Sequence, residues 1–87
     1  MIIRNFIGVH GNSIPNQFIL EYSLNKTAFQ SYKTLVAVYL HDVKTMYIDK
    51  KRYSVTTSKY LNRFKDEYSP LHIQYVENNE LYNIIEN

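Results

Sequence analysis

The feature that most constrains the fold is one unbroken apolar run near the middle of the chain, Leu35-Val36-Ala37-Val38-Tyr39-Leu40. Its residues favour β-structure, and the run is too short for an ordinary helix. A strand without polar alternation is buried on both faces. We therefore expect residues 33–41 to form the central strand of a sheet.

The segments on either side predict strands that pair with this one. Residues 17–24 alternate between apolar and polar side chains, which is typical of a half-buried strand. A tight turn at 25–26 leads into a strand over 27–32, and a turn at 41–44 leads into a shorter strand over 45–48. Because these connections are short, we expect an antiparallel meander.

After a charged segment, apolar side chains recur at helical spacing and predict the main helix. The helix begins near Thr56, with Ser54, Thr56 or Thr57 as its N-cap, and ends before Pro70. Its apolar stripe consists of Tyr60, Leu61, Phe64 and Tyr68.

The two ends of the chain complete the predicted domain. Alternation over 71–75 indicates another short strand, and Asn78 is the expected N-cap of a terminal helix. Residues 2–7 fit either a strand or an irregular lead-in, and Gly and Pro make 8–16 a loop. We predict a single α+β domain over residues 1–87, with residues 1–16 as its least regular part. It has a small antiparallel sheet of three to five strands, one main helix packed on the sheet and a short C-terminal helix.

Composition excludes several classes of protein. The chain of 87 residues has no cysteine, which removes disulfide scaffolds, cysteine-ligated zinc, iron–sulfur clusters and thiol catalysis. No apolar run approaches the ~18 residues of a membrane span, and the first residues do not resemble a secretory signal, so we expect a cytoplasmic protein. The three histidines, His10, His41 and His72, lack metal-binding spacing, and no nucleotide-binding or nucleophile motif occurs. We expect no enzymatic activity, no cofactor and no metal.

Charge is sorted along the chain although the net charge is only +2. Residues 1–43 carry +1, residues 44–65 carry +6 with Asp49 as their only acid, and residues 66–87 carry −5. The two charged blocks either face each other in the fold or form separate surfaces that meet charged partners.

The basic block lies at the start of the predicted helix, where cations are normally disfavoured. Serine and threonine hydroxyls gather at the same end, beside backbone N–H groups that lack helical partners. This combination predicts an anion site for phosphate or for carboxylates of a partner. The alternative is that the hydroxyls only cap the helix. The candidate residues are Lys50, Lys51, Arg52, Thr56, Thr57, Ser58, Lys59 and Arg63.

Two strings in the sequence resemble a known group of proteins. They are Ser31-Tyr32-Lys33-Thr34-Leu35-Val36-Ala37 and Tyr53-Ser54-Val55-Thr56-Thr57-Ser58-Lys59-Tyr60, the second followed by Asn62 and Phe64. The pattern is similar to that of small uncharacterised proteins carried by bacteriophages and other mobile elements, and the likeness covers residues 17–64. The resemblance implies a phage or mobile-element origin and implies no particular activity.

These observations lead to three hypotheses about function. The first is a phage-encoded binding protein that inhibits a host protein of nucleic-acid handling or antiviral defence, such as a CRISPR effector. Its acidic end would mimic a phosphate track, with Glu77, Glu80 and Glu86 on one exposed face and Tyr75 and Tyr82 as contact residues. The second is a small DNA- or RNA-binding protein that uses the basic block. The third is a structural or assembly factor that forms a homo-oligomer.

Overall fold

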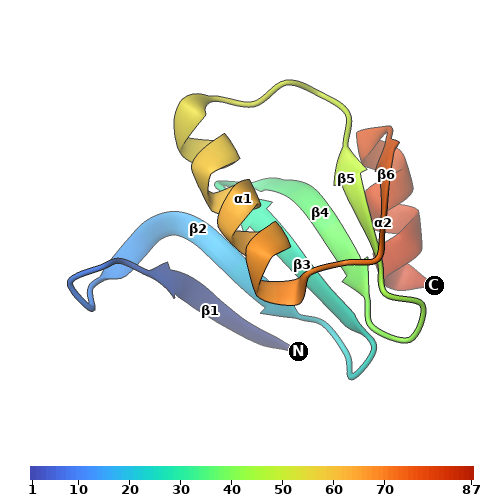
Figure 1. Cartoon of the computed structure of the whole chain (residues 1–87), viewed down its shortest axis with the longest axis horizontal. Helices are drawn as coiled ribbons and strands as arrows, with labels where there is room; N and C mark the ends of the chain where they lie inside the picture. Colours follow the sequence, from blue (N-terminus) through green and yellow to red (C-terminus); the bar gives the residue numbers. More distant parts are fainter.

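A computed structural model describes all residues 1–87, as one six-stranded sheet with two helices (Figure 1). The strands lie side by side in chain order, and the predicted α+β class is confirmed. The elements are β1 (Ile2–Ile7), β2 (Ser13–Glu21), β3 (Lys26–Ser31), β4 (Thr34–Leu40), β5 (Thr45–Asp49), α1 (Val55–Tyr68), β6 (His72–Val76) and α2 (Asn78–Glu86).

The sheet differs from the prediction in the number of its strands and in the direction of its last strand. It has six strands rather than three to five, because residues 2–7 form a strand, which is one of the two alternatives left open. The strands β1 to β5 are a meander of antiparallel pairs, but β6 is parallel to β5. The expectation of a wholly antiparallel sheet is therefore wrong at this edge. The helix α1 carries the chain back along the sheet before β6 begins, and such a crossover connects parallel strands.

The central strand β4 is buried on both faces, as its apolar run predicts. Phe29 of β3 pairs with Ala37, and the next residue, Gln30, pairs with Leu35, so Val36 is an extra residue in a β-bulge. The bulge places Val36 and Ala37 together in the core under α1, whereas Leu35 belongs to the core under α2.

Two hydrophobic cores lie on opposite faces of the sheet, because α1 and α2 cover opposite faces (Figure 1). Under α1, Phe64 packs against Phe29 with ring centroids 6.0 Å apart, and Phe6 meets Phe29 edge-on at 5.5 Å. Tyr60 and Phe64 of the predicted helical stripe are buried. Under α2, the fully buried Leu81 and the buried Ile85 contact the sheet from its other face.

The helix ends show which capping predictions hold. Ser54, one of three candidates, is the N-cap of α1, and its Oγ accepts a hydrogen bond of 3.3 Å from the backbone N–H of Thr57. Asn78 is not the N-cap of α2; that position is Glu77, which makes no side-chain capping bond. The Asn78 amide instead donates to Leu35 O and to the Asp49 carboxylate, both at 2.8 Å.

Neither helix of the structure has the length and apolar character needed to cross a bilayer.

The two-sided core predicts that α2 is a necessary part of the fold. Leu81→Ala removes a fully buried side chain and is expected to lower the free energy of unfolding by about 2–5 kcal/mol in urea denaturation. The matched control is Tyr82→Ala at the next residue, which is 41% exposed and should cost about 1 kcal/mol or less. Equal effects of the two substitutions would show that α2 does not bury the second core.

Candidate functional site

The N-terminus of α1 opens into a hollow of about 310 Å³ between the β3–β4 turn and the segment that follows β5. We call it the α1 hollow. Two cations and six hydroxyl-bearing side chains from distant parts of the sequence meet there. It is lined by Ser31, Tyr32, Thr34, Lys51, Arg52, Tyr53, Ser54 and Thr57.

The two sequence strings 31–37 and 53–60 both contribute to this hollow. Ser31 Oγ, from the first string, lies 2.9 Å from Thr57 Oγ1, from the second, and both residues are buried. Four hydroxyl-bearing residues cluster at the helix start: Ser54, Thr56, Thr57 and Ser58. Two of them have internal roles, because Ser54 caps the helix and Thr57 bonds to Ser31. Of the other two, Thr56 is exposed and Ser58 is half-buried.

Tyr32 stands at the tip of the β3–β4 turn in an unusual backbone conformation. Its φ is +56°, in the left-handed region that bulky residues seldom adopt, and its side chain is 57% exposed. The backbone N–H of Tyr32 donates to Asn16 O at 2.6 Å, which holds the turn. An aromatic ring is therefore held in solvent at the rim of the α1 hollow.

The buried Asp49 organises the segment that carries Lys51 and Arg52. Its carboxylate accepts hydrogen bonds from the Tyr53 hydroxyl at 2.5 Å, from Lys51 N at 2.8 Å and from the Asn78 amide at 2.8 Å. Burial alone would raise the pKa of the Asp49 carboxyl, but these bonds and the nearby Lys51 charge lower it below its usual value. Burial and the bond to Asp49 raise the pKa of the Tyr53 hydroxyl well above its usual value.

The predicted anion-binding cations separate into three groups, and one of them is neutralised. Lys50 Nζ lies 2.5 Å from a carboxylate oxygen of Glu77, which raises the pKa of the lysine. This is the only ion pair between the basic and acidic blocks. The other cations of residues 44–65 make no ion pair, so the two blocks do not neutralise each other. Lys51 and Arg52 belong to the α1 hollow.

Lys59 and Arg63 line a separate hollow on the side of α1 that faces the β1–β2 turn. Lys59 is exposed there, with its Nζ 5.5 Å from the Tyr60 ring centroid. Arg63 is engaged with the fold: it donates to Ile7 O at 2.8 Å, and its guanidinium lies 5.1 Å from the Phe6 ring centroid. Its contacts fit a structural role, that of joining α1 to β1.

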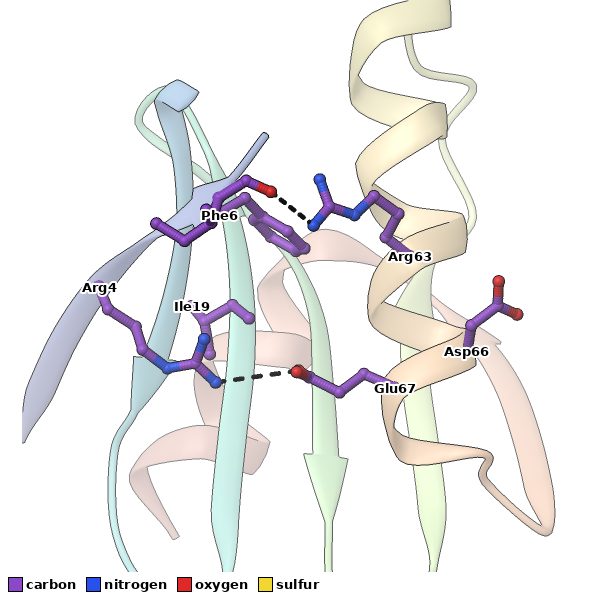
Figure 2. Close-up of a pocket in the computed structure, with 7 residues that line it drawn as sticks. Arg4, Phe6, Ile19, Arg63, Asp66 and Glu67 are labelled. Carbon is purple, nitrogen blue, oxygen red and sulfur yellow. Dashed lines mark hydrogen bonds and ion pairs between the residues drawn. The ribbon is translucent and has the colours of Figure 1, made fainter. Parts of the chain in front are cut away.

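A groove between β1 and α1 is closed by a second arginine (Figure 2). Arg4 lies between two acids, with its guanidinium nitrogens 3.5 Å from Glu21 and 3.8 Å from Glu67. Arg63 bridges the same groove through Ile7 O. Because both guanidinium groups already have partners within the chain, this groove is less suited to an anion than the α1 hollow.

The acidic residues near the C-terminus are exposed but do not form the single face that the inhibitor hypothesis requires. Glu77 pairs with Lys50. Glu80 lies in the first turn of α2, and Glu86 is six residues further, about 120° around the helix at 3.6 residues per turn. The contact residues predicted beside them, Tyr75 and Tyr82, are 61% and 41% exposed.

The residues missed by the sequence analysis are those that support the α1 hollow. The sequence gives Asp49 only as the single acid of the basic block, and Asn78 only as a cap. A lone acid that directly follows an apolar strand is a weak signal for such a role, because its partners Tyr53 and Asn78 come from later segments. No group of three or more His, Cys, Asp or Glu side chains that could hold a metal ion is present.

The fold and the hollow define a small α+β domain with one basic site at a helix start. A family model described as a family of unknown function, DUF8033, matches residues 1–79, and the chain belongs to that family. Comparison with curated proteins and with solved structures gives no significant match.

The Asp49 network predicts an acid-sensitive fold. A carboxyl whose pKa is lowered on folding stabilises the protein above its unfolded pKa of about 4, and this contribution is lost as the pH falls through the folded pKa. As the pH falls from about 5 to about 2, the free energy of unfolding should therefore decrease less for Asp49→Asn than for the wild type. Urea denaturation at several pH values measures the difference. Glu86→Asn, at an exposed acid without an ion pair, is the control and should follow the wild type.

Proposed function

We propose that this protein is a non-enzymatic binding module. It contacts the phosphate groups of nucleic acid through the cations around the N-terminus of α1. The observation that carries the proposal is the pairing pattern of the charges. Lys50 is the one cation of residues 44–65 that has a carboxylate partner, so Lys51, Arg52 and Lys59 remain available to an external anion. Phosphate neutralisation by such side chains supplies most of the affinity in non-specific nucleic-acid binding.

The surroundings of Lys51 and Arg52 favour a phosphate over an isolated carboxylate. The hollow joins two cations to hydroxyl groups and to the N-terminus of a helix of 14 residues, where unpaired backbone N–H groups attract anions. Asp49 does not line the hollow, and hydrogen bonds within the chain occupy both oxygens of its carboxylate: Oδ1 accepts from Lys51 N, and Oδ2 accepts from the Tyr53 hydroxyl and the Asn78 amide. The arrangement fits an anion with several acceptor oxygens.

Two tyrosines at the same hollow indicate a ligand with bases as well as phosphates. Tyr32 is exposed at the rim, and Tyr53 is half-buried beside Lys51, whose Nζ is 5.9 Å from the Tyr53 ring centroid. Aromatic rings beside cations are the elements that bind unpaired bases and their backbone in single-stranded nucleic acid. We therefore name single-stranded DNA or RNA as the preferred form.

The salt dependence of binding tests this function. A fluorescent oligonucleotide is titrated at several salt concentrations between about 50 and 200 mM. The slope of the logarithm of the binding constant against the logarithm of the salt concentration should fall in magnitude by about 0.7 for each phosphate contact removed. Lys51→Gln and Arg52→Gln should each lower the slope by that amount. Lys65→Gln, which removes one charge from the last turn of the same helix, is the matched control and should leave the slope unchanged.

Tyr32→Ala gives an independent readout of base stacking. It should weaken binding to a single-stranded oligonucleotide by about 1–3 kcal/mol while leaving duplex binding and the salt slope nearly unchanged. Oligonucleotide affinity that is equal for all of these variants, or undetectable at low salt, would contradict the proposed function.

A second candidate function is inhibition of a host nucleic-acid-handling or antiviral-defence protein by the acidic end. It is favoured by the exposure of Glu80, Glu86 and Tyr82 without internal ion pairs. It is the weaker candidate because Glu80 and Glu86 point to different sides of α2, whereas a phosphate mimic needs its charges on one surface.

A capture experiment with host lysate tests this second function. The wild type should retain a protein partner that salt releases, and a Glu80→Lys/Glu86→Lys variant should lose that partner. Recovery of the same proteins by both would contradict the second function.

A further inference from the structure

The strand β6 is the last strand at one edge of the sheet, and no strand pairs with its outer side (Figure 1). It pairs with β5 alone, while α1 lies over β3 and β4 and α2 over β4 and β5. Four of its five residues are exposed. Proteins usually protect an open edge with a charged side chain, a proline or a bulge within the strand. The sequence of β6, His-Ile-Gln-Tyr-Val, has no proline, lysine or acid, and its register with β5 is unbroken.

The opposite edge of the same sheet has these protections. Strand β1 carries Arg4, which is paired with Glu21 and Glu67. Its pairing with β2 is interrupted by a register shift between Asn5 and Ile7. A bulge and a charge of this kind discourage further strand pairing. The absence of both from β6 marks it as the edge at which another strand can add.

The hydrogen-bonding groups that β6 offers follow from its pairing with β5. His72 N bonds to Lys44 O, and Val76 O accepts from Lys50 N, so the even-numbered residues face the sheet. In a parallel ladder, alternate residues bond to the same neighbour. The N–H and C=O groups of Ile73 and Tyr75 therefore point outward.

A second β6 in antiparallel orientation satisfies these groups completely. With Gln74 opposite Gln74 of the second copy, Ile73 of each chain lies opposite Tyr75 of the other, and all four outward residues form hydrogen-bonded pairs. The side chains of Ile73 and Tyr75, 41% and 61% exposed, then meet across the join on the face that carries α1. Aromatic and β-branched residues are a favourable cross-strand pair.

The charges at the two ends of β6 are also complementary in this arrangement. The start of the strand lies beside Lys44, whose carbonyl accepts from Leu71 N and His72 N and which makes no ion pair. Glu80, which makes no ion pair, follows the end of the strand, and Glu77 beside it is already paired with Lys50. An antiparallel pair places the Lys44 end of one chain beside the end of the other that carries the unpaired Glu80.

We infer that two copies of this chain associate through β6 about a two-fold axis and form one continuous sheet of twelve strands. The partner is a second copy because the strand is self-complementary in its outward hydrogen-bonding groups, in its Ile–Tyr pairing and in the charges at its ends. A two-fold contact uses the same surface of both copies and closes on itself. Both α1 helices then lie on the same face of the joined sheet. This surface is separate from the α1 hollow, so the inference does not rest on the proposed function.

The mass of the full chain in solution tests the inference. Sedimentation or light scattering between about 5 and 200 µM should show a species of twice the 10.4 kDa chain mass that dissociates on dilution. Ile73→Lys/Tyr75→Lys puts like charges opposite each other and should raise the dissociation constant by about tenfold or more. Ile3→Lys, at a residue of the protected edge that is 58% exposed, is the matched control and should leave the dimer intact.

Several outcomes would overturn the inference. They are a monomer over the whole concentration range, a dimer that resists the β6 substitutions, a dimer lost with Ile3→Lys, and assemblies larger than two. Circular dichroism of the variants shows whether each has folded. Hydrogen exchange on the wild type keeps the test independent of the variants, since the amides of Ile73 and Tyr75 should exchange more slowly as the concentration rises. Concentration-independent exchange at both amides would also overturn it.

Discussion

The structure depends on the burial of one sheet from both sides. The strand β4 has no polar face, so it is stable only between two apolar layers, and the chain supplies these as α1 on one face and α2 on the other. The bulge at Val36 adjusts the strand to this position by turning two successive side chains, Val36 and Ala37, toward α1. With only two helices, each long enough to cover two or three strands, the outer strands remain partly uncovered.

The burial pattern explains why much of the fold could be predicted. The apolar run of β4, the alternation in β2 and the stripe of Tyr60 and Phe64 on α1 are local patterns, and each has one favourable solution. The direction of β6 could not be predicted in this way, because its five residues fit either edge and either direction of a sheet. The position of α1 between β5 and β6 decides it. The role of Asn78 could not be predicted for a related reason. An asparagine just before a helix fits an N-cap and a hydrogen bond to a distant residue such as Asp49 equally well.

The candidate site could be predicted only in part. Charge sorting and clustered hydroxyls are visible along the chain and led to the start of α1, where the structure does place Lys51, Arg52 and Ser54 around one hollow. The sequence did not show that Ser31 and Tyr32 complete the hollow, since they come from a turn on another strand. It also could not separate Lys50, which Glu77 neutralises, or Arg63, which binds Ile7 O, from the cations that remain free.

The parallel pairing of β5 and β6 has a consequence for the order in which the chain folds. The strands β1 to β5 are joined by short turns, so each pairing closes a small loop at little entropic cost. The strand β6 meets β5 only after the whole of α1 has been placed over the sheet, and Asn78 reaches Asp49 later still. Contacts of such long sequence separation form slowly. We expect the meander to assemble first, with the acidic end of the chain closing the second core as the final event.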